Sequence, residues 1–190
     1  MKKLSYLKRK KGFTLVELVV VIAIVGVLAG ILIPTLVGTV RSANVASANT
    51  AATDIRKSVN IWITMMDAKG HTINKSVNTD NDPFVTIVAD KKIYDITFSE
   101  SFWSKKEDVE ALKASLNDHL LNNLGYRELV AIGYLHNGSI AALAYCVNLE
   151  ESTSDMPEFE DFNRKDYWSG TNGIADDGTV IGTSPQIING

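Results

Sequence analysis

A long apolar run near the start of the chain limits what this sequence can form more than any other feature. From Phe13 to Val40 there are 28 consecutive residues with a single ionisable side chain, Glu17. A helix of that length spans about 42 Å, which exceeds the roughly 30 Å hydrocarbon core of a bilayer. The apolar region of a cleaved secretory signal is only about 7–15 residues long. The run therefore predicts a hydrophobic transmembrane helix over residues 13–40 rather than an ordinary secretory signal.

The charges that precede this run predict its orientation. The first twelve residues carry six basic side chains and no acidic one, whereas the remaining 178 residues carry 13 basic and 22 acidic side chains. Because cytoplasmic flanks of membrane helices are enriched in lysine and arginine, we expect a single-pass precursor in the plasma (inner) membrane with a cytoplasmic N-terminus. The formal net charge of −3 gives no reason to expect a nucleic-acid partner. The six basic residues are Lys2, Lys3, Lys8, Arg9, Lys10 and Lys11.

A plain membrane anchor does not explain Glu17. A carboxylate at the centre of a membrane helix costs on the order of 2.5–3.5 kcal/mol, so it requires a partner. No basic side chain lies between Phe13 and Arg41. Cleavage after Gly12 would create one, because the new α-amine of Phe13 would be a cation one helical turn before Glu17. The carboxylate could then pair with this amine in its own subunit or in a neighbouring one.

The residues around this glutamate form a motif. Lys11–Glu17 reads KGFTLVE and is followed by about twenty mostly apolar residues. This pattern resembles the class III leader of type IV prepilins and of the related pseudopilins. The resemblance implies that a prepilin peptidase cleaves between Gly12 and Phe13, which removes residues 1–12 as a basic leader peptide, and methylates the amine of Phe13. It also implies that Glu17 is the assembly residue, which docks onto the amine of the next subunit.

Small residues and a proline recur every four positions along the apolar run. The step from Gly26 to Gly30 is a small-xxx-small spacing that allows helix backbones to approach closely. Proline removes a backbone hydrogen bond and glycine weakens a helix. One interpretation is ordinary membrane-helix composition, in which both residues are common. The other is a segment near residues 31–38 that loses helicity when subunits enter a filament, as the resemblance implies. The stripe consists of Gly26, Gly30, Pro34 and Gly38.

After Arg41 the apolar positions recur in steps of three and four, which predicts one face of an amphipathic helix over residues 41–68. Gly70 is a suitable stop signal. A single helix over residues 13–68 is therefore expected, and a coiled coil is the less favoured alternative because the repeat is short and poorly flanked by charges. The predicted buried stripe is Val45, Ala48, Ala52, Ile55, Val59, Trp62 and Met66.

The remainder of residues 41–190 predicts a globular head with a small antiparallel sheet. Two strand-like runs, Phe84–Ala89 and Ile93–Phe98, suit one hairpin, and Leu129–Leu135 and Ile140–Val147 suit a second around the turn signal Asn137-Gly138. The expected fold class is thus α+β, with the long N-terminal helix packed on the sheet.

A second helix is predicted between the two hairpins. Ser104–Glu107 has the spacing of a capping box, and Gly125 is a suitable stop. The predicted buried face of this helix consists of Val109, Leu112, Leu116 and Leu120.

From Glu150 the chain becomes acidic and loop-like. Its only cysteine, Cys146, cannot form an intramolecular disulfide and is expected to be a small buried core residue. Here the sequence differs from the many Gram-negative pilins whose C-terminal region is held by a disulfide. The segment must instead be held by packing, by an ion or not at all. The candidates for packing are Phe159, Phe162, Tyr167 and Trp168.

No pattern in the chain predicts an enzyme, a cofactor or a metal site. The acidic pairs Asp80 with Asp82 and Asp176 with Asp177 lack EF-hand spacing, so calcium is not expected. The sequence contains no nucleophile elbow, phosphate-binding loop or dinucleotide-binding motif. The three histidines lack the spacing of a zinc site. They are His71, His119 and His136.

The resemblance implies a structural subunit of a type IV pilus, a surface filament of the kind used in adhesion and motility. Its implied partners are a prepilin peptidase, the pilus assembly platform, the membrane before assembly and further copies of itself in a helical filament. The alternatives are a pseudopilin of a type II secretion or competence system, a minor tip pilin, and a membrane-anchored enzyme or binding protein that is never processed.

Overall fold

In the computed structural model, the described residues are 12–77, 83–90, 93–98, 100–105, 107–125, 129–147, 156–176 and 178–189. The chain divides into two compact units, Met1–Ser42 and Ala43–Gly190. Together the long N-terminal apolar helix and the antiparallel sheet confirm the predicted α+β class.

Helix α1 spans Leu15–Ala68 and contains Pro34 within it. Because proline has no N–H to donate, the carbonyl of Gly30 lacks the usual backbone donor one turn later. The helix is nevertheless continuous through this point. The predicted loss of helicity concerns subunits that have entered a filament, so it stays a prediction.

The second half of α1 supplies the core of the globular unit. All seven residues of the predicted stripe are buried, which confirms the amphipathic pattern. Ala51, Ser58 and Ile63 are buried as well, so the buried face is wider than predicted. Ile61 and Met65 lie on the exposed face and remain 56% and 44% exposed.

The sheet has five strands in the order β2-β1-β3-β4-β5, and all neighbouring strands are antiparallel. Both predicted hairpins are confirmed, and the second turns at Asn137 and Gly138, whose φ angles are 53° and 79°. Strand β5 was not predicted, because the tail had been expected to be a loop. The strands are β1 Val85–Asp90, β2 Ile93–Thr97, β3 Leu129–His136, β4 Ser139–Cys146 and β5 Ile181–Ser184.

Helix α2 spans Val109–Leu124, and Leu112, Leu116 and Leu120 are buried as predicted, whereas Val109 is only partly buried against the same core. The predicted capping box at its start is wrong. Asp108 is the N-cap, and its side chain accepts a hydrogen bond from the N–H of Ala111. A carboxylate satisfies this position as well as serine does, because either oxygen can accept from the free N–H groups of the first turn.

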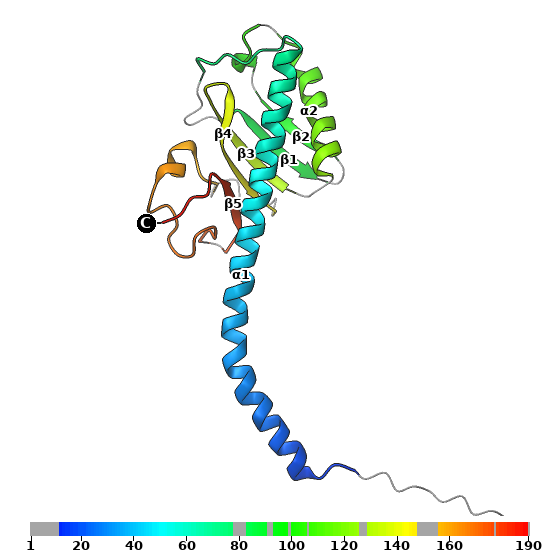
Figure 1. Ribbon diagram of the computed structural model, residues 1–190, viewed down its shortest axis with the longest axis vertical. Coiled ribbons are helices and arrows are strands. Elements are labelled where there is room, and N and C mark those ends of the chain that lie inside the picture. Colours follow the sequence, from blue (N-terminus) through cyan, green and yellow to red (C-terminus); the bar gives the residue numbers. More distant parts are fainter. Residues whose placement is uncertain are drawn as a thin grey trace, which may run out of the picture. The chain divides into compact units, whose positions relative to one another are not determined.

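Both faces of the sheet are covered (Figure 1). On one face, the second half of α1 and α2 enclose a large core that includes Trp62, Phe84 and Leu116. On the other face, the C-terminal segment covers a smaller core that includes Cys146, Trp168 and Ile181. Cys146 is fully buried, as predicted. The alternate residues of β3 and β4 therefore contribute to two different cores.

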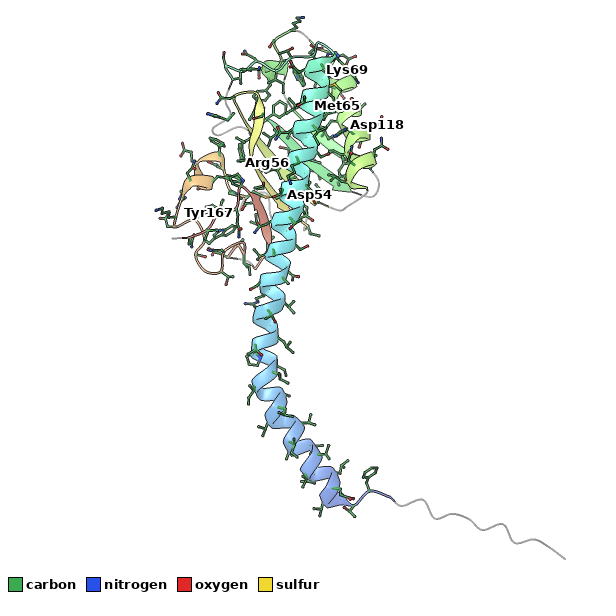
Figure 2. The ribbon with its side chains drawn as sticks, viewed as in Figure 1. Asp54, Arg56, Met65, Lys69, Asp118 and Tyr167 are labelled. Carbon is green, nitrogen blue, oxygen red and sulfur yellow. The ribbon has the colours of Figure 1, made fainter. Side chains whose placement is uncertain are left out.

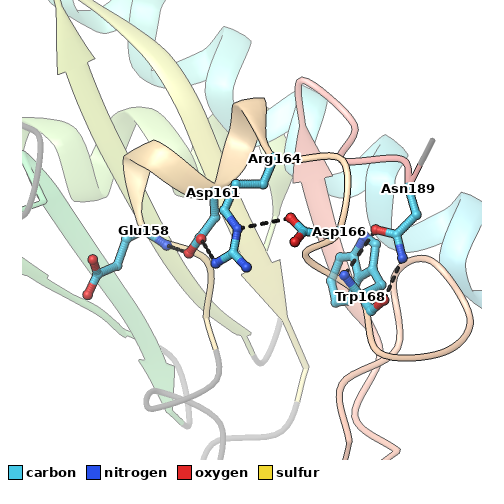
Figure 3. Close-up of polar contacts among 6 residues, drawn as sticks. All are labelled: Glu158, Asp161, Arg164, Asp166, Trp168 and Asn189. Atoms are coloured by element: carbon cyan, nitrogen blue, oxygen red, sulfur yellow. Dashed lines mark hydrogen bonds and ion pairs between the residues drawn. The ribbon is translucent and has the colours of Figure 1, made fainter.

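The C-terminal segment is held by packing and hydrogen bonds. Trp168 is buried, and its Nε1–H donates to the carbonyl of Ile187 at 3.0 Å. Its backbone N–H donates to Oδ1 of Asn189 at 3.0 Å (Figure 3). The predicted aromatic contacts are confirmed, since Phe162 and Tyr167 pack against the smaller core and Phe159 contacts Tyr134.

This segment is also tied to α1. The backbone N–H of Thr183 in β5 donates to Oδ1 of Asn49 at 2.8 Å, and Oγ1 of Thr53 donates to Oγ of Ser184 at 3.1 Å. A Cβ atom at Gly182 would overlap the carbonyl of Ala48, so β5 approaches the helix backbone more closely than a side chain allows. Strand β5 is thus attached to α1 by hydrogen bonds and close backbone contact and not by a disulfide.

Candidate functional site

The predicted cleavage site lies immediately before α1. Gly12, Phe13 and Thr14 have no regular secondary structure, and Phe13 is 91% exposed. Nothing lies within 4 Å of the position that a Cβ would take at Gly12. Among the described residues, nothing therefore covers the peptide bond between Gly12 and Phe13.

The first turn of α1 brings Thr14 and Glu17 together in a reciprocal arrangement. Oε2 of Glu17 accepts hydrogen bonds from the backbone N–H and from the hydroxyl of Thr14, each at 2.8 Å. In return, the N–H of Glu17 donates to Oγ1 of Thr14 at 3.2 Å. This is a capping box, in which a threonine at the N-cap and a glutamate three residues later satisfy each other's backbone donors.

The capping box gives Glu17 a second explanation that sequence reasoning missed. The Thr-x-x-Glu spacing was visible in Thr14–Glu17, but the carboxylate was interpreted only as a charge that lacked a cation. A carboxylate near a helix N-terminus is also favoured by the partial positive charge of the unpaired N–H groups. Neutral donors of Thr14 therefore stabilise the carboxylate of Glu17 without any cation.

The stripe of small residues lies along the same helix without contacts to other described elements. Nothing lies within 4 Å of a Cβ built at Gly26, Gly30 or Gly38. The large apolar side chains from Leu15 to Val40 are all about half exposed or more and project from the helix (Figure 2). Among the described residues, α1 is the one helix long and apolar enough to cross a membrane. These residues form an uncovered apolar surface rather than an enclosed site.

Three hydroxyl side chains follow Pro34 and bond back to the helix. Oγ1 of Thr35 donates to the carbonyl of Leu32 at 2.8 Å, Oγ1 of Thr39 to that of Leu36 at 2.9 Å, and Oγ of Ser42 to that of Gly38 at 3.1 Å. Such bonds provide polar partners for the carbonyls of a membrane helix and allow it to bend. Sequence reasoning had not singled them out.

Among the described residues, the acidic pairs considered as metal ligands form no metal site. The described part of the chain contains no cluster of three or more potential metal ligands, and Asp80, Asp82 and Asp177 lie outside the described residues. Oδ1 of Asp176 accepts from the hydroxyl of Ser169.

The histidines make separate structural contacts. Nδ1 of His71 lies 2.7 Å from a carboxylate oxygen of Glu107, and Nε2 of His119 lies 3.0 Å from the carbonyl of Ser58. The ring of His136 stacks on that of Phe159.

Comparison with known proteins identifies the motif. Residues 7–33 match the family model of the prokaryotic N-terminal methylation motif, which is the class III signal peptide of type IV pilins and pseudopilins. The match spans the predicted cleavage site, Glu17 and the start of the small-residue stripe. Neither the curated proteins nor the solved structures contain a match to the chain. The chain therefore carries a pilin-type leader, and it has the features of a membrane-anchored precursor that a prepilin peptidase processes.

Proposed function

We propose that this chain is the structural subunit of a type IV pilus and that it has no catalytic activity of its own. One observation carries the proposal. The methylation motif at residues 7–33 includes the first part of α1, whose apolar side chains are uncovered from Leu15 to Val40. A surface of this kind needs a bilayer or the corresponding helices of other subunits to cover it.

The proposed sequence of events begins with the precursor in the membrane and ends with Glu17 in the filament. The basic leader holds the N-terminus in the cytoplasm while α1 waits in the inner membrane. Prepilin peptidase cleaves the bond between Gly12 and Phe13 and methylates the amine of Phe13. The assembly platform then lifts the subunit from the membrane into a surface filament. There Glu17 exchanges neutral donors of Thr14 for the cationic amine of a neighbouring subunit.

The apolar helix supplies cohesion in the filament, but only through close packing. Lipid chains are as apolar as leucine, so moving α1 from a bilayer into a helical bundle gains little from the hydrophobic effect. Association then depends on close contacts and on polar pairs. Gly26 and Gly30 allow the first, and Glu17 with Phe13 provides the second. A pseudopilin or a minor tip pilin has the same leader and is the alternative assignment.

Mass spectrometry of filaments sheared from the producing cells tests the proposal. Abundant protein that begins at methylated Phe13 is the expected result. Scarce protein with the same N-terminus would favour the pseudopilin or minor pilin. A chain that begins at Met1 and stays in the membrane would contradict the proposal. A Gly12→Val variant, which alters the residue before the scissile bond, serves as the uncleaved control.

A further inference from the structure

The C-terminal segment contains a pocket that the proposed function does not use. Its volume is about 300 Å³. Part of its lining is aromatic or apolar and part is acidic. The apolar side includes Tyr167, Trp168 and Ile174, and the acidic side includes Glu158, Asp161 and Asp176.

The aromatic wall of the pocket is preformed. The rings of Tyr167 and Trp168 lie edge to face, with centroids 4.8 Å apart and planes at 79°. Trp168 is only 5% exposed and is held by its hydrogen bonds to Asn189 (Figure 3) and to Ile187. A wall fixed in this way loses little side-chain entropy when a ligand binds.

The charges around the pocket favour a cation. Arg164 already pairs with Asp161 at 2.9 Å and with Asp166 at 3.4 Å, and its guanidinium lies 6.0 Å from the centre of the Tyr167 ring. Among the described residues, no cationic side chain pairs with Glu158 or Asp176. The pocket therefore keeps uncompensated negative charge beside an aromatic ring, an arrangement that attracts ammonium and guanidinium groups and repels anions.

The neighbouring Tyr134 lies close enough to the same carboxylates to be affected by their charge. Its hydroxyl is buried and donates to the carbonyl of Pro157 at 3.2 Å. Burial, together with the charges of Glu158 and Asp161, raises the pKa of Tyr134 to about 12. A second negative charge is thus disfavoured next to the pocket.

The distribution of charge along the sequence indicates where the cation comes from. Residues 150–190 carry nine acidic and two basic side chains, whereas residues 41–149 carry 12 acidic and 11 basic ones. Residues 41–149 are thus nearly neutral overall, but several of their exposed lysines have no ion-pair partner among the described residues. A second copy of the chain can therefore offer a single lysine ammonium group to the acidic side of the pocket. These lysines are Lys57, Lys69, Lys75 and Lys105.

We propose that this pocket receives a lysine ammonium group from a second copy of the chain, as an ionic contact between the heads of neighbouring subunits. This inference rests on the proposed function, because a filament places the heads of many copies side by side. The contact is separate from the pairing of Glu17 with Phe13 and adds to it.

Zero-length cross-linking tests the contact in the assembled protein. Filaments grown from mixed light and heavy isotope-labelled copies would be treated with a carbodiimide, which joins a carboxylate to a lysine amine. We expect mixed-label cross-links from Glu158 or Asp176 to one of the four exposed lysines. Cross-links between copies that involve other carboxylates but never these two would overturn the inference.

A variant pair provides a second measurement. The double change Glu158→Gln with Asp176→Asn should lower the yield of filaments that survive high shear by on the order of twofold or more, because surface ion pairs are individually weak but repeat at every subunit. The matched control is Glu160→Gln. Glu160 is an exposed carboxylate in the short helix Phe159–Asn163, which follows Glu158, but it does not line the pocket. Equal losses in both variants would contradict a role for the pocket.

The two proposals fail in different ways. A wild-type chain that forms no filament contradicts the proposed function and this inference together. A normal filament without the cross-links contradicts this inference alone. The cross-linking uses the wild-type chain, so its result holds even where the double variant does not fold.

Discussion

The carboxylate of Glu17 accepts two hydrogen bonds from Thr14, one from its backbone N–H and one from its hydroxyl, both at 2.8 Å. These donors belong to the chain itself and are present before cleavage. Cleavage after Gly12 would add a third donor, the amine of Phe13, directly before Thr14. The same carboxylate thus caps the helix in the intact chain, and under the proposed function it would pair with a cation after processing.

Removal of this carboxylate should separate cleavage from assembly. We expect Glu17→Ala to be cleaved normally, because the scissile bond lies outside the helix, but to lower filament yield about tenfold or more, since hydrogen bonds to charged groups contribute about 1.5–3 kcal/mol. Filament yield and the mass of the N-terminal peptide are the measurements. Glu17→Gln keeps the shape and one acceptor without the charge. Normal filament yield in both variants would refute the pairing of Glu17 with the amine.

The leader and the long helix could be predicted because their signals are local. The apolar run from Phe13 to Val40 and the stripe that follows Arg41 depend on spacing alone. The capping box at Thr14–Glu17 is just as local, but it was missed because one explanation for the glutamate concealed another. The predicted start of α2 was also wrong. Ser104 and Asp108 are both suitable N-cap residues, so the sequence alone does not decide at which of them the helix begins.

Substitution of Gly182 should weaken the attachment of the C-terminal segment. A methyl group there overlaps the carbonyl of Ala48. This carbonyl belongs to the helix backbone, and the methyl carbon is fixed to the strand backbone, so neither can rotate away. We expect Gly182→Ala to lower the free energy of unfolding by about 1–3 kcal/mol, as overpacking does elsewhere. Thermal unfolding of the full chain in detergent measures the change. Gly170→Ala is the control, because a Cβ at Gly170 meets nothing within 4 Å. Equal stability of the two variants would contradict the close approach.

Strand β5 shows what the sequence could not reveal. Ile181–Ser184 has only four residues and includes a glycine, which is depleted in strands, so local propensity favoured a loop. Its pairing with β4 and its contact with Ala48 join segments far apart in the chain. Such a strand exists because of its neighbours. The same holds for the pocket near Trp168, whose lining residues carry no motif.

A single hydrogen bond from Thr183 to Asn49 should help to hold β5 against α1. Oδ1 of Asn49 accepts from the N–H of Thr183, which points away from β4. Asn49→Ala would leave that N–H without a partner, at a cost of about 1–3 kcal/mol. We expect faster hydrogen–deuterium exchange in peptides that contain β5. Asn44→Ala, at an exposed position on the same helix, should leave this exchange unchanged. Unchanged exchange in Asn49→Ala would contradict a role for this hydrogen bond in holding β5.

Tyr134 should make the stability of the globular unit depend on alkaline pH. Its pKa is about 12 in the folded chain, against about 10 for an unperturbed tyrosine. The folded state therefore retains the phenolic proton to higher pH than the unfolded state does. The resulting stabilisation is fully present below about pH 10 and is lost as the pH rises from about 10 to 12, by up to about 1.4 kcal/mol per pH unit.

The variant Tyr134→Phe removes this proton, together with the hydrogen bond to Pro157. We expect it to be less stable than the wild type at neutral pH and to lose less further stability between about pH 10 and 12. Chemical unfolding measured at intervals from pH 7 to 12 gives both curves. Below pH 9 the two curves should run parallel, because Tyr134 does not titrate there. Curves that remain parallel above pH 10 would contradict the raised pKa. They would also remove the support that Tyr134 gives to a negative potential beside the pocket.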